Sequence, residues 1–173
     1  RRGNPPAVPC PAMRILLCLA LLLTFWSPSQ GAPLRIEDPV LSPIGSHGKA
    51  RLRSLVSPGD GALLILFSPG CRSCRDGIRE ALGGLKGKVK VIPVSTSYPP
   101  REYLEERWRE WGFKVQGYVD PGDRIFRAIQ VREVPVFAFV RGEDGALLVL
   151  KVLDGRATSG HLASQARRLG MIR

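Results

Sequence analysis

From residue 61 onward, the hydrophobic positions of the chain follow two alternating patterns. Residues 62–67 and 89–94 are short, largely apolar runs, which are typical of strands covered on both faces of a sheet. Residues 71–85 and 101–111 instead carry apolar side chains at helical spacing, with charged residues between them. Strands that alternate with helices predict parallel crossover connections, and therefore an α/β fold.

The last third of the chain predicts an antiparallel addition to that sheet. Residues 134–140 read as a strand with Pro135 at its entrance, and residues 146–153 as its partner across a polar turn at 141–145. A final amphipathic helix is expected over residues 160–169. The central sheet should therefore be mixed, with helices flanking it.

Shorter elements complete this expectation. Residues 40–52 predict a hairpin within a loop-rich lead-in, and residues 113–119 predict a short strand. A turn at 120–123 precedes a short helix over 124–129, and Asp123 is expected to cap that helix.

The N-terminal residues predict a targeting signal rather than part of the folded domain. Residues 15–26 are apolar, a run of about a dozen, which suits a signal-peptide core and is short for a membrane span. Cleavage is expected after Gly31, and the alternative is an uncleaved anchor that attaches the chain to a membrane. Residues 1–31 are thus upstream residues with a signal peptide or anchor, and 32–173 are a domain expected in the periplasm or another extracytoplasmic space.

Composition and charge exclude several classes of protein. The 173 residues are 44% hydrophobic and 24% charged, which is ordinary for a globular chain and excludes a disordered or polytopic membrane protein. Cleavage after Gly31 would remove three arginines and no acidic residue, which would lower the formal net charge from +11 to +8. The basic residues are scattered and form no arginine–aromatic array, so no nucleic-acid partner is expected.

The candidate chemistry lies at the predicted start of the helix over 71–85. Removal of Cys10 and Cys18 with the signal would leave only Cys71 and Cys74, and a lone pair at this spacing in an exported chain indicates redox chemistry. Free backbone N–H groups and the helix dipole favour a thiolate at Cys71.

The pair predicts a two-cysteine exchange cycle. Cys71 is the expected nucleophile, and Cys74, one turn along the helix, is the expected resolving thiol that releases the mixed disulfide. Arg72 and Arg75 flank the pair and are expected to lower the thiol pKa. Two alternatives stay open at this point: an inert structural disulfide, or transient Cu(I) binding by the two thiolates.

These residues resemble a known family. A strand, the sequence Cys-Arg-Ser-Cys at 71–74, alternating helices and strands, and Val134-Pro135 before a hairpin resemble the thioredoxin fold. The loop-rich lead-in and the extra helix over 101–111 are similar to exported thioredoxin-like proteins of the TlpA/ResA/DsbE type. The resemblance covers about residues 39–169. It implies a three-layer α/β sandwich, thiol–disulfide oxidoreductase activity on protein disulfides, a separate reducing partner, and no cofactor or metal.

The resemblance also assigns substrate-binding roles. It implies that Pro135 is a cis-proline facing the cysteines, that the backbone of Val134 pairs with an extended substrate segment, and that Gly70 borders the same site. Departures from the family pattern are Gly70 in place of an aromatic residue, Gly77 in place of a glutamate, and Arg79 in place of a proline. The missing glutamate removes the expected base for Cys74.

The function predicted from the sequence is reduction, or exchange, of disulfides in exported proteins, with cytochrome c maturation as one setting. An oxidase role competes with the reductase role, because stabilising the thiolate makes the pair more oxidising. The alternative of a different class is a thioredoxin-like copper carrier or a redox-inactive binding module.

Overall fold

The apolar run after Asp60 forms the central strand of the fold. The computed structural model describes residues 33–172, and in it β4 (Gly61–Phe67) is fully buried from Ala62 to its end. β4 pairs in parallel with β5 (Lys90–Thr96) and antiparallel with β7 (Val136–Glu143). A strand that is covered on both faces and paired at both edges has no solvent-exposed face, which explains why its sequence is continuously apolar.

The eight strands form one mixed sheet in the order β1-β8-β7-β4-β5-β6-β2-β3. This arrangement confirms the mixed sheet and its antiparallel addition, and the predicted hairpin over 40–52 is present as the pairing of β2 with β3. The remaining strands are β1 (Arg35–Glu37), β2 (Val40–Pro43), β3 (Ala50–Arg51), β6 (Tyr118–Asp120) and β8 (Ala146–Asp154).

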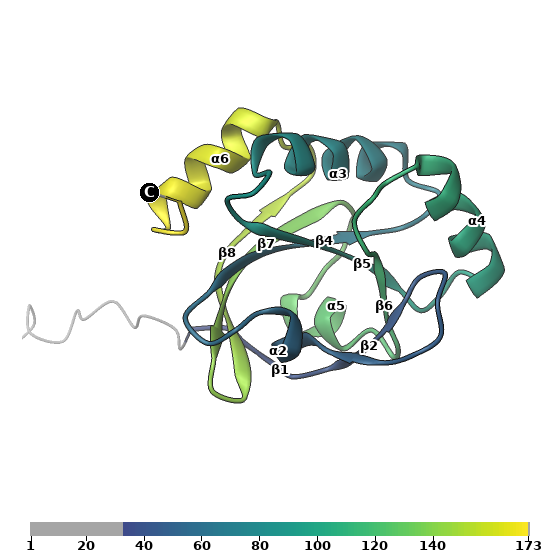
Figure 1. Cartoon of the computed structure of the whole chain (residues 1–173), viewed down its shortest axis with the longest axis horizontal. Helices are drawn as coiled ribbons and strands as arrows, with labels where there is room; N and C mark the ends of the chain where they lie inside the picture. The colour runs from purple at the N-terminus through teal and green to yellow at the C-terminus, as the bar shows by residue number, and fades with distance from the viewer. Residues whose placement is uncertain (1–32, 173) are drawn as a thin grey trace, which may run out of the picture. The chain divides into compact units, whose positions relative to one another are not determined.

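Helices cover both faces of the sheet and complete a three-layer sandwich (Figure 1). One apolar cluster packs α3, α4 and α6 against one face, and a second packs α2 and α5 against the other. The helices are α2 (Leu52–Leu55), α3 (Arg72–Gly84), α4 (Arg101–Trp111), α5 (Arg124–Ile129) and α6 (Ser159–Arg168).

The strand predicted over 113–119 is shorter and later than expected. β6 begins only at Tyr118, because Phe113 packs against the aromatic rings of α4 instead of extending the sheet. The ring of Phe113 lies 5.5 Å from that of Trp108 and 6.0 Å from that of Trp111, between ring centroids. The aromatic side chains of α4 therefore anchor this helix to the body of the domain.

The predicted cap of α5 is wrong. The side chain of Asp123 makes no capping hydrogen bond and instead accepts hydrogen bonds from the backbone N–H and the hydroxyl of Ser97. The buried Asp120 takes the capping place, where its Oδ2 accepts a hydrogen bond of 2.7 Å from the N–H of Ile125. Burial raises the pKa of the Asp120 carboxyl above its ordinary value, although backbone hydrogen bonds from the start of α5 oppose the rise.

Replacing Asp120 by asparagine is expected to change how stability depends on pH. Because the folded-state pKa of Asp120 is raised, its protonated form favours the fold, and that contribution is lost as pH rises through the folded-state pKa. The free energy of unfolding of Asp120→Asn, measured in urea, should therefore improve relative to the native chain between pH 4 and pH 7. Asp120→Ala, which loses the cap, should be less stable at both pH values by about 1 kcal/mol. A relative loss of stability in Asp120→Asn with rising pH would contradict this assignment.

The predicted signal or anchor segment, the cleavage point after Gly31, Cys10 and Cys18 lie outside the described residues. Within residues 33–172, no helix combines the length and the apolar character that a membrane crossing needs.

Candidate functional site

The two cysteines lie at the start of α3, just after the loop that connects it to β4. The chain leaves β4 at Phe67, turns through residues 68–70, and enters α3 with Cys71 as the N-cap residue. The backbone of Cys71 is extended, and its Sγ accepts a hydrogen bond of 3.0 Å from the N–H of Cys74. Cys71 therefore occupies the end of α3 where backbone donors are free to stabilise negative charge on sulfur.

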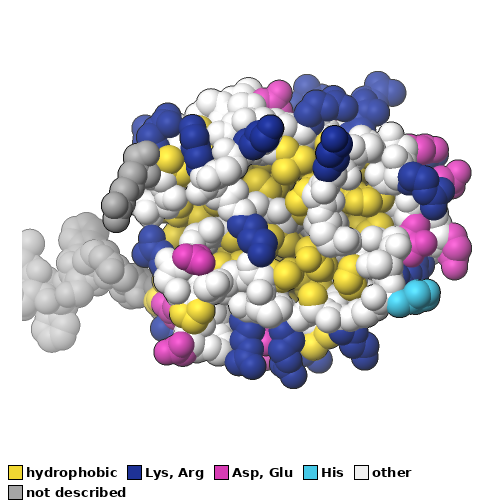
Figure 2. Space-filling view, in the orientation of Figure 1, with side chains coloured by type: hydrophobic (Ala, Val, Ile, Leu, Met, Phe, Trp, Pro, Cys, Tyr) yellow, Lys and Arg dark blue, Asp and Glu magenta, His cyan; other side chains and the backbone are white. Residues whose placement is uncertain are grey.

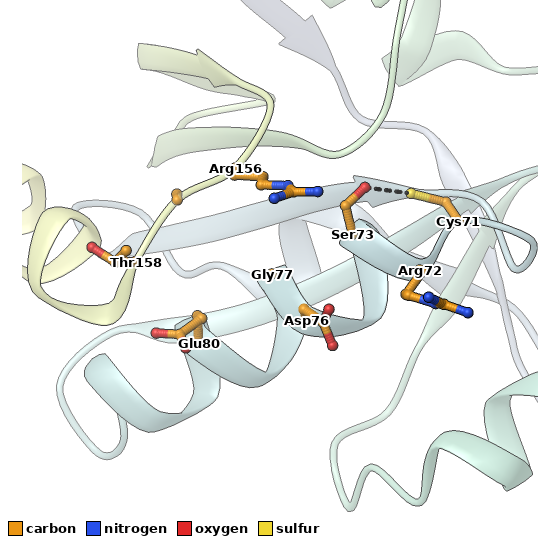
Figure 3. A pocket seen from close by; sticks show the side chains of 9 residues that line it. Cys71, Arg72, Ser73, Asp76, Gly77, Glu80, Arg156 and Thr158 are labelled. Atoms are coloured by element: carbon orange, nitrogen blue, oxygen red, sulfur yellow. Dashed lines mark hydrogen bonds between the residues drawn. The ribbon is translucent and has the colours of Figure 1, made fainter.

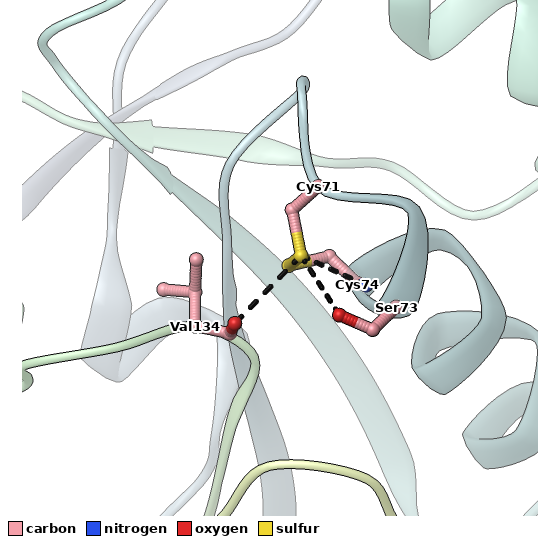
Figure 4. Close-up of a disulfide and its surroundings, with 4 residues drawn as sticks. All are labelled: Cys71, Ser73, Cys74 and Val134. Atoms are coloured by element: carbon pink, nitrogen blue, oxygen red, sulfur yellow. Dashed lines mark hydrogen bonds between the residues drawn. A yellow bond between two sulfur atoms is a disulfide. The ribbon is translucent and has the colours of Figure 1, made fainter.

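Cys71 and Cys74 form a disulfide, with their Cα atoms 5.2 Å apart (Figure 4). Cys74 is fully buried, whereas Cys71 is only partly buried and is therefore the cysteine that a second molecule can approach. The hydroxyl Oγ of Ser73 lies 3.2 Å from the Cys71 Sγ. This arrangement suits Cys71 to react first with a partner, and Cys74 to react with Cys71.

The loop that enters β7 faces this disulfide. The carbonyl oxygen of Val134 lies 3.7 Å from the Cys71 Sγ, and the Val134–Pro135 peptide bond is cis. The carbonyl of Pro135 accepts a 3.0 Å hydrogen bond from the N–H of Gly155, which ties this loop to the segment after β8. The fold thus brings Val134 and Pro135, over 60 residues later in the chain, to the cysteine pair.

Gly70, Arg72 and Arg75 lie on one side of the disulfide. All three border a cleft that begins at Cys71 and extends toward α4. Arg72 is exposed, and Arg75 is partly buried with its Nε 3.7 Å from Oδ1 of Asp76. The remaining sequence-predicted site residues therefore share this location.

A second cleft opens on the other side of Cys71 and contains residues that the sequence did not indicate. It is bordered by Ser73 and by Arg156 and Thr158 from the segment between β8 and α6, and Figure 3 shows Arg156 extending toward the start of α3. Arg156 lies 85 positions after Cys71, so no local pattern could have placed it here. Ser73 could have been found, because it stands between the two cysteines.

Glu80 joins α3 to the beginning of α6. Its carboxylate accepts a hydrogen bond of 2.8 Å from the N–H of Ser159 and another from the Ser159 hydroxyl. These hydrogen bonds lower the pKa of Glu80. Asp76, one turn earlier on α3, pairs with Arg79 at 3.4 Å and more distantly with Arg75.

Phe137 accounts for the glycine at the place where the family resemblance would put a glutamate. Gly77 follows Cys74 by one turn of α3 and is buried. A Cβ atom on Gly77 would lie 2.7 Å from Cζ of Phe137, whose side chain is completely buried in β7. The aromatic ring fills the space next to Gly77, and the surroundings of Cys74 are an apolar cluster.

Comparisons with known proteins give the fold. No protein-family model matches the sequence, and no curated protein matches it significantly. A thiol:disulfide interchange protein of the thioredoxin family from Chlorobium tepidum superposes with a TM-score of 0.63 at 11% identity, over 81% of this chain and 98% of that one. The chain has the thioredoxin fold.

Two further structures of this fold come from extracytoplasmic proteins. A secreted Mycobacterium tuberculosis disulfide oxidoreductase homologous to Escherichia coli DsbE matches at 16% identity with a TM-score of 0.58, over 75% of this chain and 94% of that one. The exposed lipoprotein thioredoxin Etrx1 of Streptococcus pneumoniae matches at 18% identity with a TM-score of 0.59, over 76% and 98%. At such identities the likeness establishes the thioredoxin fold, and the chemistry must be argued from this chain's own residues.

Among the described residues, no three His, Cys, Asp or Glu side chains converge in a way that could hold a metal ion.

Proposed function

We propose that this chain is an extracytoplasmic thiol–disulfide oxidoreductase that works through Cys71 and Cys74. The observation that carries the proposal is the disulfide itself: a partly buried sulfur at the start of α3 is joined to a fully buried one and faces the carbonyl of Val134. A purely structural disulfide would close a loop too short to constrain the unfolded chain much. The secreted and lipoprotein matches support a location outside the cytoplasm.

The proposed reaction begins with the reduced pair. The Cys71 thiolate attacks one sulfur of a substrate disulfide, a mixed disulfide forms, and the substrate's other sulfur leaves as a thiolate that takes a proton from water. Cys74, once deprotonated, attacks the Cys71 Sγ and releases the second substrate thiol. Two electrons have then passed to the substrate, and the Cys71–Cys74 disulfide of the structure is the product.

Several groups around Cys71 support its role as the leaving and attacking sulfur. The N–H of Cys74 already donates to the Cys71 Sγ at 3.0 Å, and the Ser73 hydroxyl is 3.2 Å away. Both contacts, with the helix dipole and the positive charges of Arg72 and Arg75, favour a thiolate over a thiol. Stabilisation of the thiolate is the usual property of a reactive cysteine.

The substrate backbone is proposed to lie along the loop before β7. The backbone of Val134 would pair with an extended segment around the substrate's cysteine, as in other recognition by strand addition, while Pro135 and Gly70 border the same approach. The carbonyl of Val134 lies 3.7 Å from the Cys71 Sγ, which supports this path for the substrate segment.

The proposed direction of electron flow is from the cysteine pair to the substrate disulfide, which is thereby reduced. A separate electron donor would then reduce the Cys71–Cys74 disulfide again, and cytochrome c maturation is one setting for such a reaction.

The proposed function is tested by adding the protein, with excess dithiothreitol, to insulin and following precipitation of the freed insulin chains. We expect a clear acceleration over dithiothreitol alone, and a rate equal to the background would contradict the proposal.

A further inference from the structure

The cleft between the start of α3 and α4 is strongly basic. It is bordered by Cys71, and its lining contains three arginines, two aromatic side chains and no acidic residue. In Figure 2, dark-blue basic side chains lie along the top of the view, where α3 lies. Acidic side chains lie at the right, over α4. The lining of the cleft includes Gly70, Cys71, Arg72, Arg75, Tyr103 and Arg107.

The positive charge of this cleft is only partly neutralised. Arg107 pairs with Glu110 at 2.6 Å and lies over the ring of Tyr103, with its Cζ 5.3 Å from the ring centroid. The nearest carboxylate to Arg75, that of Asp76, is 3.7 Å away and also pairs with Arg79. Among residues 33–172, Arg72 has no ion-pair partner.

Arg75 also borders the cleft with its guanidinium. Its Nε is buried, lies 3.7 Å from Oδ1 of Asp76 and has no hydrogen-bond acceptor among the described residues. The Arg75 side chain as a whole is 40% exposed, so a carboxylate oxygen bound in the cleft can gain a charge-assisted hydrogen bond from the rest of the guanidinium.

The cleft is placed to contact whatever reacts with Cys71. Tyr103 brings α4 close to the cysteine loop, since a Cβ atom on Gly70 would lie 3.9 Å from the Tyr103 hydroxyl. A substrate whose disulfide reaches the Cys71 Sγ can therefore place residues that flank its cysteine over the arginines of the cleft.

We propose that this cleft selects protein substrates that carry aspartate or glutamate close to the reactive cysteine, an inference that rests on the proposed oxidoreductase function. Carboxylates beside the substrate disulfide are attracted to Arg72, Arg75 and Arg107, which speeds the encounter and orients the substrate sulfur at Cys71. Basic flanking residues are repelled by the same charges.

The test compares three disulfide-bonded peptides of equal length whose flanking residues are acidic, neutral or basic. Single-turnover exchange with the reduced protein is followed by acid quenching, alkylation and mass. At low ionic strength we expect the acidic peptide to react roughly tenfold faster than the basic one, with the ratio shrinking as salt screens the charges. Glutathione disulfide, a small carboxylate-bearing disulfide, is run in parallel and should react more slowly than the acidic peptide.

Two variants on the same helix separate the cleft from the general charge of the protein. Arg107→Gln should lower the acidic-to-neutral rate ratio by roughly threefold, the value of one partly exposed charge. Arg109→Gln removes the same charge from an exposed position that does not border the cleft, and should leave that ratio unchanged.

The outcomes distinguish this inference from the proposed function. Absence of exchange with every peptide would overturn the proposed oxidoreductase function itself. Exchange at equal rates with all three peptides, an equal effect of Arg107→Gln and Arg109→Gln, or a faster reaction with glutathione disulfide would overturn the inference and leave the proposed function standing.

Discussion

Cys71→Ser is expected to lower disulfide exchange to the rate of buffer alone, because a serine hydroxyl at the start of α3 stays protonated and cannot attack a disulfide. Cys74→Ser should behave differently, since Cys71 can still attack but the resolving sulfur is lost. That variant should accumulate a mixed disulfide with an added peptide, in a one-to-one ratio. Mass measurement after acid quenching separates these two results.

The contrast between the two variants is what the burial of the sulfurs predicts. Cys71 is partly buried and borders both clefts, while Cys74 is completely buried and borders neither. Formation of a stable mixed disulfide by Cys71→Ser, through Cys74, would contradict these roles. Equal exchange rates in the native chain and in Cys71→Ser would contradict the mechanism as a whole.

Gly77→Glu is expected to destabilise the fold by about 3 kcal/mol or more, although a glutamate is what the family resemblance would place there. Its Cβ would meet the buried ring of Phe137 at 2.7 Å, and its carboxylate would enter the apolar cluster around Cys74. The free energy of unfolding in urea, compared with that of the native chain, measures the loss.

A matched control for this variant lies two turns further along α3. A Cβ atom on Gly83 would meet only the Ser159 Oγ, at 3.9 Å, so Gly83→Ala should be neutral or stabilising by about 0.5–1 kcal/mol through its helix propensity. A stable Gly77→Glu chain would show that Phe137 can move aside and that the site can accept a carboxylate below Cys74.

The sequence was most informative where a single pattern decides the structure. The unbroken apolar run of β4 is typical of a strand covered on both faces, and the position of Cys71 shortly after it predicted a cysteine at a helix start. The cysteine pair, with Val134 and Pro135, was recognisable because the order of these motifs along the chain is itself a signal.

Contacts between distant segments were the part that the sequence could not supply. The sequence predicted Asp123 as the cap of α5, and only the burial of Asp120 and the contact of Asp123 with Ser97 show that Asp120 takes this place. Arg156 borders the cleft beside Cys71, where the hydrogen bond from Gly155 to Pro135 holds its segment, and Glu80 contacts Ser159 rather than an arginine. Such choices depend on packing between elements rather than on local pattern.

The reduction potential of the Cys71–Cys74 pair is the most direct measurement of the central claim, that this pair is a redox-active couple that delivers electrons. The protein is equilibrated in glutathione and dithiothreitol buffers, alkylated, and read by mass. A reversible two-electron couple at or below about −250 mV is the predicted result. A couple near −120 to −180 mV would contradict the reductase direction and indicate an oxidant or isomerase. The absence of any reversible couple would contradict the oxidoreductase assignment.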